Sequence, residues 1–141
     1  MLCPVCQEQL VILEVEGVEL DMCYEGHGMW FDHDELRQLF LGTSAPETLR
    51  DLEQRLEKLP HKGEKRRCPR CRRKMWQVAA PGDGERVILD ACPMNHGIWF
   101  DQGELEAILD TQFTGDDDEL RAIKDHLGLF VKPAVQGDDP S

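Results

Sequence analysis

Apolar and polar residues follow two similar patterns, one in each half of the chain. Residues 10–22, LVILEVEGVELDM, contain two short runs rich in β-branched residues, with a turn signal at Glu16 and Gly17 between them. Such a pattern predicts a β-hairpin. Residues 75–79 and 86–90 repeat it around the turn sequence PGDG at 81–84. We therefore expect one hairpin in each half.

A short helical pattern comes after each hairpin. Asp32 and Glu35 have the spacing of a capping box, and Leu36, Leu39 and Phe40 then fall on one helical face, with Gly42 as the expected stop. The same order recurs in the second half, with Asp101, Glu104, Leu105, Ile108 and Leu109. The recurrence of the carboxylate pair before a helix favours capping over acid–base chemistry.

Two more helices are expected away from the hairpins. Leucines at positions 49, 52, 56 and 59 are spaced as on a helix covering residues 44–60. We interpret this helix as a linker rather than a dimerisation seam, because the stripe is too short for a self-sufficient coiled coil. Asp116 and Glu119 form another capping pattern and predict a short terminal helix. The acidic tail after it is too poor in apolar residues to pack, so we expect it to be disordered.

A duplicated motif relates the two halves. Residues 20–36 and 89–105 are identical at ten of seventeen positions, and a CxxC pair precedes each, as CPVC and then CPRC. Each copy therefore provides three cysteines and one histidine in the order CxxC, spacer, CxxxH. This is the ligand set and spacing of a structural zinc site. The expected ligands of two zinc ions are Cys3, Cys6, Cys23 and His27 in the first repeat, and Cys68, Cys71, Cys92 and His96 in the second.

Other uses of these residues are less consistent with the pattern. Three disulfides could join the six cysteines, but each repeat has an odd number of them beside one histidine, and MLCPVCQEQ lacks the features of a secretion signal. A rubredoxin-like iron site would need four thiolates. The alternative for each histidine is that it only caps a knuckle, while water or a carboxylate completes the site. We expect zinc and a reducing, cytoplasmic compartment.

The fold expected from these elements is a small metal-stabilised α+β fold. It consists of two tandem zinc ribbons, each made of a zinc knuckle, a β-hairpin, a second knuckle and a short helix. The expected boundaries are 1–42 for ribbon 1, 43–62 for the helical linker, 63–112 for ribbon 2, 113–130 for the C-terminal helix and 131–141 for the disordered acidic tail.

Charge adds a possible binding surface. The formal net charge is -12, which would repel nucleic acid from most of the surface. Residues 62–74, KGEKRRCPRCRRK, form a basic island around the first knuckle of the second repeat, and Trp76 follows it. The residues that could contact nucleic acid or an acidic partner are Lys65, Arg66, Arg67, Arg70, Arg72, Arg73, Lys74 and Trp76.

These motifs also carry a family resemblance. CPVC with HGMWFDHDEL, and CPRC with HGIWFDQGEL, resemble the bacterial zinc-ribbon family described as transcription-factor-IIB-type zinc fingers. The likeness covers about residues 2–40 and 67–109 and implies a zinc-ribbon fold with the six cysteines as ligands. Many members have a fourth cysteine three residues after the third. Here those positions hold Gly26 and Asn95, so the fourth ligand has to be His27 or His96, one residue later.

The expected function is that of a non-enzymatic, zinc-binding module that contacts a protein partner, with a possible link to transcription. A closed four-ligand site leaves no position for a reactive water, and the sequence shows no other catalytic pair or phosphate loop. The alternative is nucleic-acid binding through the basic island, with Trp76 stacking on a base. No apolar run approaches the length of a membrane span. The partner and the oligomeric state are not determined by the sequence.

Overall fold

The computed structural model describes residues 1–15, 17–41, 51–60, 66–80, 87–105 and 107–108. Its named elements are seven strands, one α-helix and one short 3-10 helix, and residues 104–105 and 107–108 are helical as well. The strands are β1 (Val11–Val15), β2 (Val18–Met22), β3 (Gly28–Asp32), β4 (Glu57–Lys58), β5 (Trp76–Ala79), β6 (Ile88–Ala91) and β7 (Gly97–Asp101); the helices are α1 (Glu35–Phe40) and the 3-10 helix η1 (Leu52–Gln54). The α+β class and the zinc-ribbon fold are confirmed by this structure together with the two Cys/His clusters described below.

Both predicted hairpins are present. Strands β1 and β2 are antiparallel, with Val15 opposite Val18 across the turn, and β5 and β6 pair in the same way. Each hairpin gains a third strand that the sequence reasoning did not foresee, because β2 pairs with β3 and β6 pairs with β7. The signal for these strands was the apolar run after each GHG or NHG, since such runs are typical of a central strand buried on both faces.

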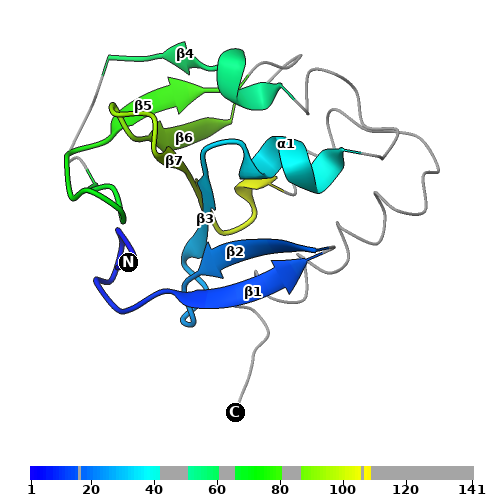
Figure 1. Ribbon diagram of the computed structural model, residues 1–141. Helices are drawn as coiled ribbons and strands as arrows, with labels where there is room; N and C mark the ends of the chain where they lie inside the picture. The colour runs from blue at the N-terminus through cyan, green and yellow to red at the C-terminus, as the bar shows by residue number, and fades with distance from the viewer. Residues whose placement is uncertain (16, 42–50, 61–65, 81–86, 106, 109–141) are drawn as a thin grey trace.

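The two repeats join through these third strands. Strand β3 pairs antiparallel with β7, with Trp30 opposite Trp99 at the centre of the register. The result is one seven-stranded sheet in the order β1-β2-β3-β7-β6-β5-β4, which Figure 1 shows from β4 at the top to β1 at the bottom. The ribbon boundaries stay a prediction, but the two ribbons share one sheet.

Two glycines make the join possible. A Cβ atom on Gly28 would lie 2.2 Å from the carbonyl oxygen of Phe100, and one on Gly97 would lie 2.2 Å from the carbonyl oxygen of Phe31. Both distances are far below van der Waals contact, and the obstacle is backbone. Gly28 and Gly97 therefore let the backbones of the two repeats approach each other closely.

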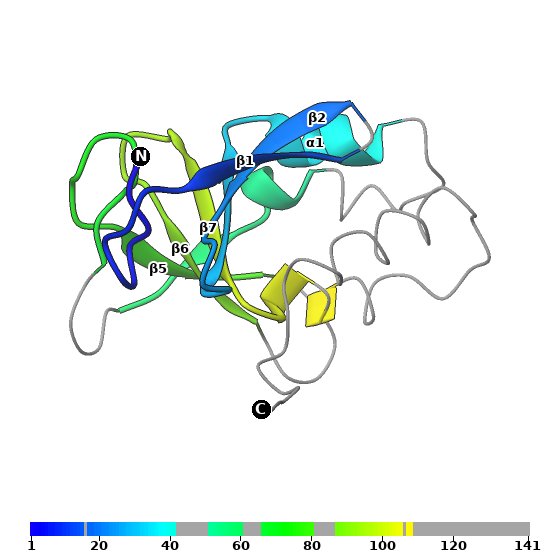
Figure 2. The ribbon, with the colours of Figure 1, turned by 90° about the horizontal axis from the view of Figure 1, so that it is seen from below.

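Each face of the joined strands carries its own core. Met29 and Phe31 of β3, with Ile98 and Phe100 of β7, pack with α1 and the hairpins on one face, where the rings of Phe31 and Phe100 meet edge to face at 5.2 Å. Trp30 and Trp99 point to the opposite face and pack among the cysteines of both repeats. Figure 2 shows β7 between the β1–β2 hairpin with α1 on one side and β5 and β6 on the other. Neither half buries its apolar residues alone, as expected for units this small.

The linker helix predicted for residues 44–60 is wrong for the part that the structure describes, residues 51–60. Leu52 begins the single 3-10 turn η1, and Glu57–Lys58 is the short strand β4 on the edge of β5. Pairing with the open edge of β5 and burial of Leu52, which is 2% exposed, outweigh the helical leucine spacing. Residues 43–50 lie outside the described residues.

The capping pattern is half confirmed. Glu35 and Glu104 each accept a hydrogen bond from the backbone N–H of Asp32 or Asp101, at 2.8 Å in both repeats, as a capping box requires. The aspartates do not cap. The residue before α1 is Asp34, in the left-handed conformation with φ 74°, and its side chain makes no capping hydrogen bond. In the second repeat residues 104–105 and 107–108 are helical.

The predicted C-terminal helix (113–130) and disordered acidic tail (131–141) lie outside the described residues. Within those residues, no helix is long and apolar enough to cross a membrane.

Candidate metal centres

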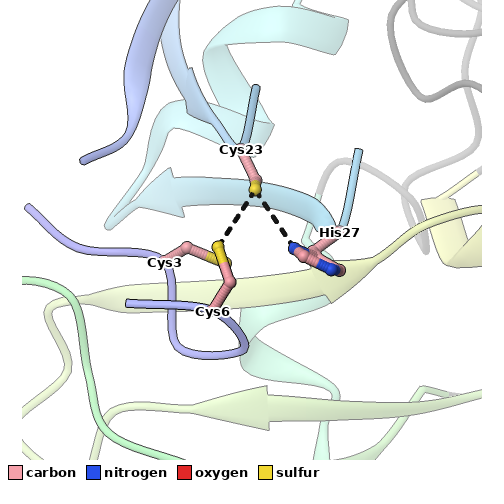
Figure 3. A group of neighbouring side chains, drawn as sticks. All are labelled: Cys3, Cys6, Cys23 and His27. Atoms are coloured by element: carbon pink, nitrogen blue, oxygen red, sulfur yellow. Dashed lines mark hydrogen bonds between the residues drawn. The ribbon is translucent and has the colours of Figure 1, made fainter. Parts of the chain in front are cut away.

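Four side chains converge in each repeat. In the first, Cys3 and Cys6 come from the turn before β1, and Cys23 and His27 from the turn between β2 and β3 (Figure 3). In the second, Cys68, Cys71, Cys92 and His96 occupy the equivalent positions. Within each group one sulfur or nitrogen atom per residue lies within 4.8 Å of all the others. The structure thus brings together all eight residues that the spacing singled out.

The distances fit tetrahedral zinc. Cys23 Sγ lies 3.7 Å from Cys6 Sγ and 3.3 Å from His27 Nδ1. In the second repeat, Cys92 Sγ lies 3.6 Å from Cys71 Sγ and 3.4 Å from His96 Nδ1. A tetrahedron with Zn–S bonds of about 2.3 Å and Zn–N bonds of about 2.0 Å has edges of about 3.8 Å and 3.5 Å. A disulfide would need about 2.05 Å between sulfurs, and all six cysteines are free.

The backbone of each first turn is shaped for a thiolate. The chain after Cys3 folds back so that Gln7 N–H donates to the Cys3 carbonyl, with Gln7 in the left-handed conformation at φ 66°. Arg72 does the same at φ 68° in the second repeat. This turn brings the N–H of Val5 to Cys3 Sγ and that of Arg70 to Cys68 Sγ, both at 3.3 Å. Donors aimed at sulfur favour the charged thiolate that zinc requires.

The thiols of a metal-free centre are unequal. Burial raises the pKa of Cys3 and of Cys68 to about 12. For Cys23, burial is outweighed by hydrogen bonds from the His27 backbone and ring, which lower the pKa to about 7. Zinc must therefore displace protons held firmly at the two buried thiols, so its binding weakens as the solution becomes more acidic.

The histidine of each metal centre is hydrogen-bonded to the backbone of the other repeat. The backbone N–H of His33 donates to the carbonyl of His96 at 2.8 Å, and Gln102 N–H donates to the carbonyl of His27 at 3.0 Å. The fully buried Trp30 and Trp99 lie in the same apolar cluster as the cysteines of both centres, where they shield the metal sites from solvent. Each histidine is thus positioned by a strand end of the other ribbon.

Comparison with known families agrees with this geometry. A family model described as transcription factor zinc-finger matches residues 2–41 and matches again at residues 67–111. The chain belongs to the transcription factor zinc-finger family. Searches of curated proteins and of solved structures give no match.

As a member of this family with two copies of the ribbon, the chain binds two zinc ions, one in each Cys3His cluster. The histidine that stands one position beyond the usual fourth cysteine still reaches the cluster, because its Nδ1 atom faces the third thiolate. Four protein ligands complete each tetrahedron, which is the arrangement of a structural zinc site rather than a catalytic one.

Two arginines of the basic island are used inside the protein. Arg70 forms an ion pair with Asp32 of the other ribbon through two hydrogen bonds. The Oδ1 atom of Asp32 also accepts a hydrogen bond from Trp30 Nε1 at 2.7 Å. Arg66 lies 2.5 Å from Asp101 and 3.3 Å from Asp90. No local sequence pattern predicts these contacts, because Arg70 and Asp32 are 38 positions apart and Arg66 and Asp101 are 35 positions apart.

The remaining residues of the island are more open. Arg67, Arg72, Arg73 and Lys74 are exposed, although Arg72 also reaches Gln7 of the other ribbon at 3.3 Å. Trp76 is 37% exposed, and the Nζ atom of Lys58 lies over its ring at 3.9 Å from the centroid, a cation–π contact. Lys65 lies outside the described residues.

The pH dependence of stability can be used to test the environment of the partly buried carboxyl group of Glu104. Burial, with Asp101 and Asp90 nearby, raises its pKa from 4.5 to about 7. The folded state therefore holds this proton more tightly than the unfolded chain does. The contribution of the protonated carboxyl to the free energy of unfolding is fully present below pH 4.5 and is lost as the pH rises through about 7. Glu104→Gln keeps an acceptor for Asp101 N–H and removes the charge. We expect it to be about 1–2 kcal/mol more stable than wild type at pH 8, allowing for partial exposure.

The measurement is urea unfolding of the zinc-loaded protein between pH 6 and 8. The advantage of Glu104→Gln should increase with pH across this range. Glu8→Gln, at an exposed position, is the matched control and should show no such trend. A variant that is equally or less stable than wild type at pH 8 would contradict the raised pKa.

Proposed function

We propose that the protein is a non-enzymatic binding module, in which two structural zinc ions hold a rigid sheet that contacts a protein partner. The observation that carries this proposal is the closed ligand set. Each cluster has four protein ligands, and the two knuckles are packed against Trp30 and Trp99 in one apolar cluster. A metal with four protein ligands stabilises a fold and leaves no position for a substrate or a reactive water.

The surface also supports a protein partner. Ile12 is 68% exposed and Val11 40% exposed on an edge strand, and Tyr24 and Met94 are exposed beside the metal-binding turns. The free thiols and the family's zinc chemistry support a reducing compartment such as the cytoplasm. The family description supports a role near transcription as part of the same proposal.

The proposal can be tested with the zinc-loaded full chain as an immobilised bait, compared with the same protein after removal of zinc. We expect a defined protein to be retained by the zinc-loaded bait alone and to remain bound after nuclease treatment. Retention that disappears with nuclease would instead support nucleic-acid binding. Turnover of a substrate by the zinc-loaded protein would refute a non-enzymatic role.

Nucleic-acid binding through the basic island is the second candidate, and it has one specific observation in its favour. Arg67, Arg73 and Lys74 are exposed, and the partly exposed Trp76 follows Lys74 by two positions in the chain. Against it, Arg66 and Arg70 are engaged in ion pairs with aspartates, and Lys58 already covers the Trp76 ring.

We expect binding to single-stranded or duplex nucleic acid to be no tighter than the non-specific range, about 10⁻⁴ to 10⁻⁶ M at physiological salt. Fluorescence anisotropy with labelled oligonucleotides over a salt series measures this. The variant Arg67→Ser, Arg73→Ser, Lys74→Ser tests the island, and Arg37→Ser, which removes an exposed arginine of α1 outside the island, is the control. Tighter binding that is steeply salt-dependent and is lost in the triple variant alone would favour the nucleic-acid function.

A further inference from the structure

The two outermost hairpin strands, β1 and β5, are equivalent in the repeat, but only β5 has a further strand paired with its outer edge among the described residues. Cys68 follows Cys3 by 65 positions, and the same offset aligns β5 with β1, the first strand of each hairpin. In the second repeat, β4 covers the outer edge of β5, with Lys58 opposite Val78. In the first repeat, β1 pairs with β2 only, as far as the described residues extend. Figure 1 shows β1 at the lower rim of the sheet.

The outer edge of β1 has backbone groups ready for another strand. The N–H of Leu59, which follows β4, donates to the carbonyl of Gln77 at 2.9 Å, so Gln77 directs its backbone groups outward from β5. Gln77 corresponds to Ile12. Because alternate residues of a strand point their hydrogen-bonding groups to the same side, Ile12 and Glu14 direct theirs to the open edge. An edge of this kind is a template for strand addition.

The charge around this edge defines the chemistry of its partner. Glu14 lies directly opposite Glu19 across the hairpin, both are exposed, and Ile12 lies opposite Asp21. Like charges facing each other across two strands destabilise a hairpin. The equivalent pair in the second repeat, Ala79 and Ile88, is uncharged. A second copy of β1 would add further carboxylates to this face, whereas a basic side chain would relieve the repulsion.

We propose that the open edge of β1 binds an extended segment of a partner protein, in which basic residues alternate with apolar ones, as an eighth, antiparallel strand of the sheet. A basic side chain of the segment lies opposite Glu14, and an apolar one lies opposite Leu13. The register is that of β4 on β5, where consecutive residues Glu57 and Lys58 lie opposite Ala79 and Val78. This inference rests on the proposed protein-binding function and names its surface and the chemistry of its partner.

The probe is the peptide acetyl-Val-Lys-Val-Lys-Val-amide, with acetyl-Val-Glu-Val-Glu-Val-amide as its matched control. Each is titrated into the zinc-loaded, ¹⁵N-labelled full chain and followed by two-dimensional NMR. The lysine peptide should shift the amide signals of residues 11–15 more than those of β5, and it should bind about tenfold more tightly than the glutamate peptide.

Two changes separate strand addition from simple charge attraction. Two methylated peptides can be made, one with methyl groups on the backbone nitrogens of the odd-numbered residues and one with them on the even-numbered residues, and neither change alters the charge. One of the two should not bind, because its methylated nitrogens are those that face β1. The charge-reversed variant Glu14→Lys, Glu19→Lys should prefer the glutamate peptide. Both positions are exposed, so the variant should fold, which the fluorescence of Trp30 and Trp99 can verify.

Several outcomes would overturn the proposal. They are shifts that avoid residues 11–15, equal binding of both methylated peptides, and an unchanged preference of the charge-reversed variant. Cross-strand contacts in NMR between residues 11–15 and residues 109–141 would show that the chain covers its own edge. A mass in solution of two chains that is lost in the charge-reversed variant would show that a second copy does so.

The capture experiment distinguishes this inference from the proposed function. A partner that the charge-reversed variant retains as well as wild type does would leave the binding function standing and place it on another surface. Failure of the zinc-loaded wild type to retain any protein would count against the function itself, whatever the peptides show.

Discussion

Gly97→Ala should destabilise the zinc-loaded protein by about 3 kcal/mol or more, one of the two largest effects that we expect from a single substitution. The added Cβ would lie 2.2 Å from the carbonyl oxygen of Phe31 and 2.7 Å from Cζ2 of Trp30, which is completely buried. Neither atom can move without opening the β3–β7 pairing that joins the ribbons. Urea unfolding monitored by tryptophan fluorescence measures the effect.

Gly103→Ala is the matched control. Gly103 has φ +85°, so alanine there is strained, but nothing lies within 4 Å of its Cβ position. We expect a cost of only about 1 kcal/mol from the backbone conformation. If Gly97→Ala were no more destabilising than Gly103→Ala, the close approach of the two ribbons would not exist in solution. Gly28→Ala should behave as Gly97→Ala does, since its surroundings are equivalent.

Removing one zinc ligand should weaken both metal centres. Cys71→Ser takes one thiolate from the second centre, so we expect that centre to lose its zinc under competition with a chelator. His96, freed from the metal, no longer fixes the carbonyl that accepts the N–H of His33, and the cluster around Trp30 and Trp99 loosens. The first centre should therefore bind zinc about tenfold more weakly than in wild type, a coupling in the usual range.

Native mass spectrometry counts the zinc ions, and competition with a coloured chelator gives the affinity of the centre that remains. Cys6→Ser is the mirror experiment and should weaken the second centre by a similar factor, since coupling between two binding sites is reciprocal. Tyr24→Ser, at an exposed position beside Cys23, is the control and should leave both centres unchanged. Wild-type affinity at the first centre of Cys71→Ser would show that the two ribbons bind zinc independently.

Local patterns were sufficient for the elements that form within a short stretch of chain. The spacing of CxxC and CxxxH identified residues that do converge, because a turn of four or five residues leaves its ligands few positions. The two hairpins followed from β-branched runs around turn residues.

Local patterns do not predict the structure where a distant segment competes with a local preference. The leucine spacing of residues 49–59 favours a helix, yet an open strand edge at β5 draws Glu57–Lys58 into the sheet. Asp32 has the position of a helix cap, but its carboxylate is taken by Trp30 and by Arg70 of the other ribbon. Nucleic-acid binding by the basic island was the alternative function, and no local pattern predicted that Arg66 and Arg70 of the island pair with aspartates.

The sequence by itself determined the family, the two zinc ions, their ligands and the hairpins that carry them, because each depends on residues close together in the chain. Only the tertiary structure decided that the ribbons join through β3 and β7, that two glycines allow that contact, and that β4 covers one sheet edge while no strand of the described residues covers the other. The join depends on pairing between segments about 70 residues apart, and the covered edge depends on pairing between β4 and β5, whose opposed residues are 20 and 22 positions apart; a single sequence carries no local signal for either.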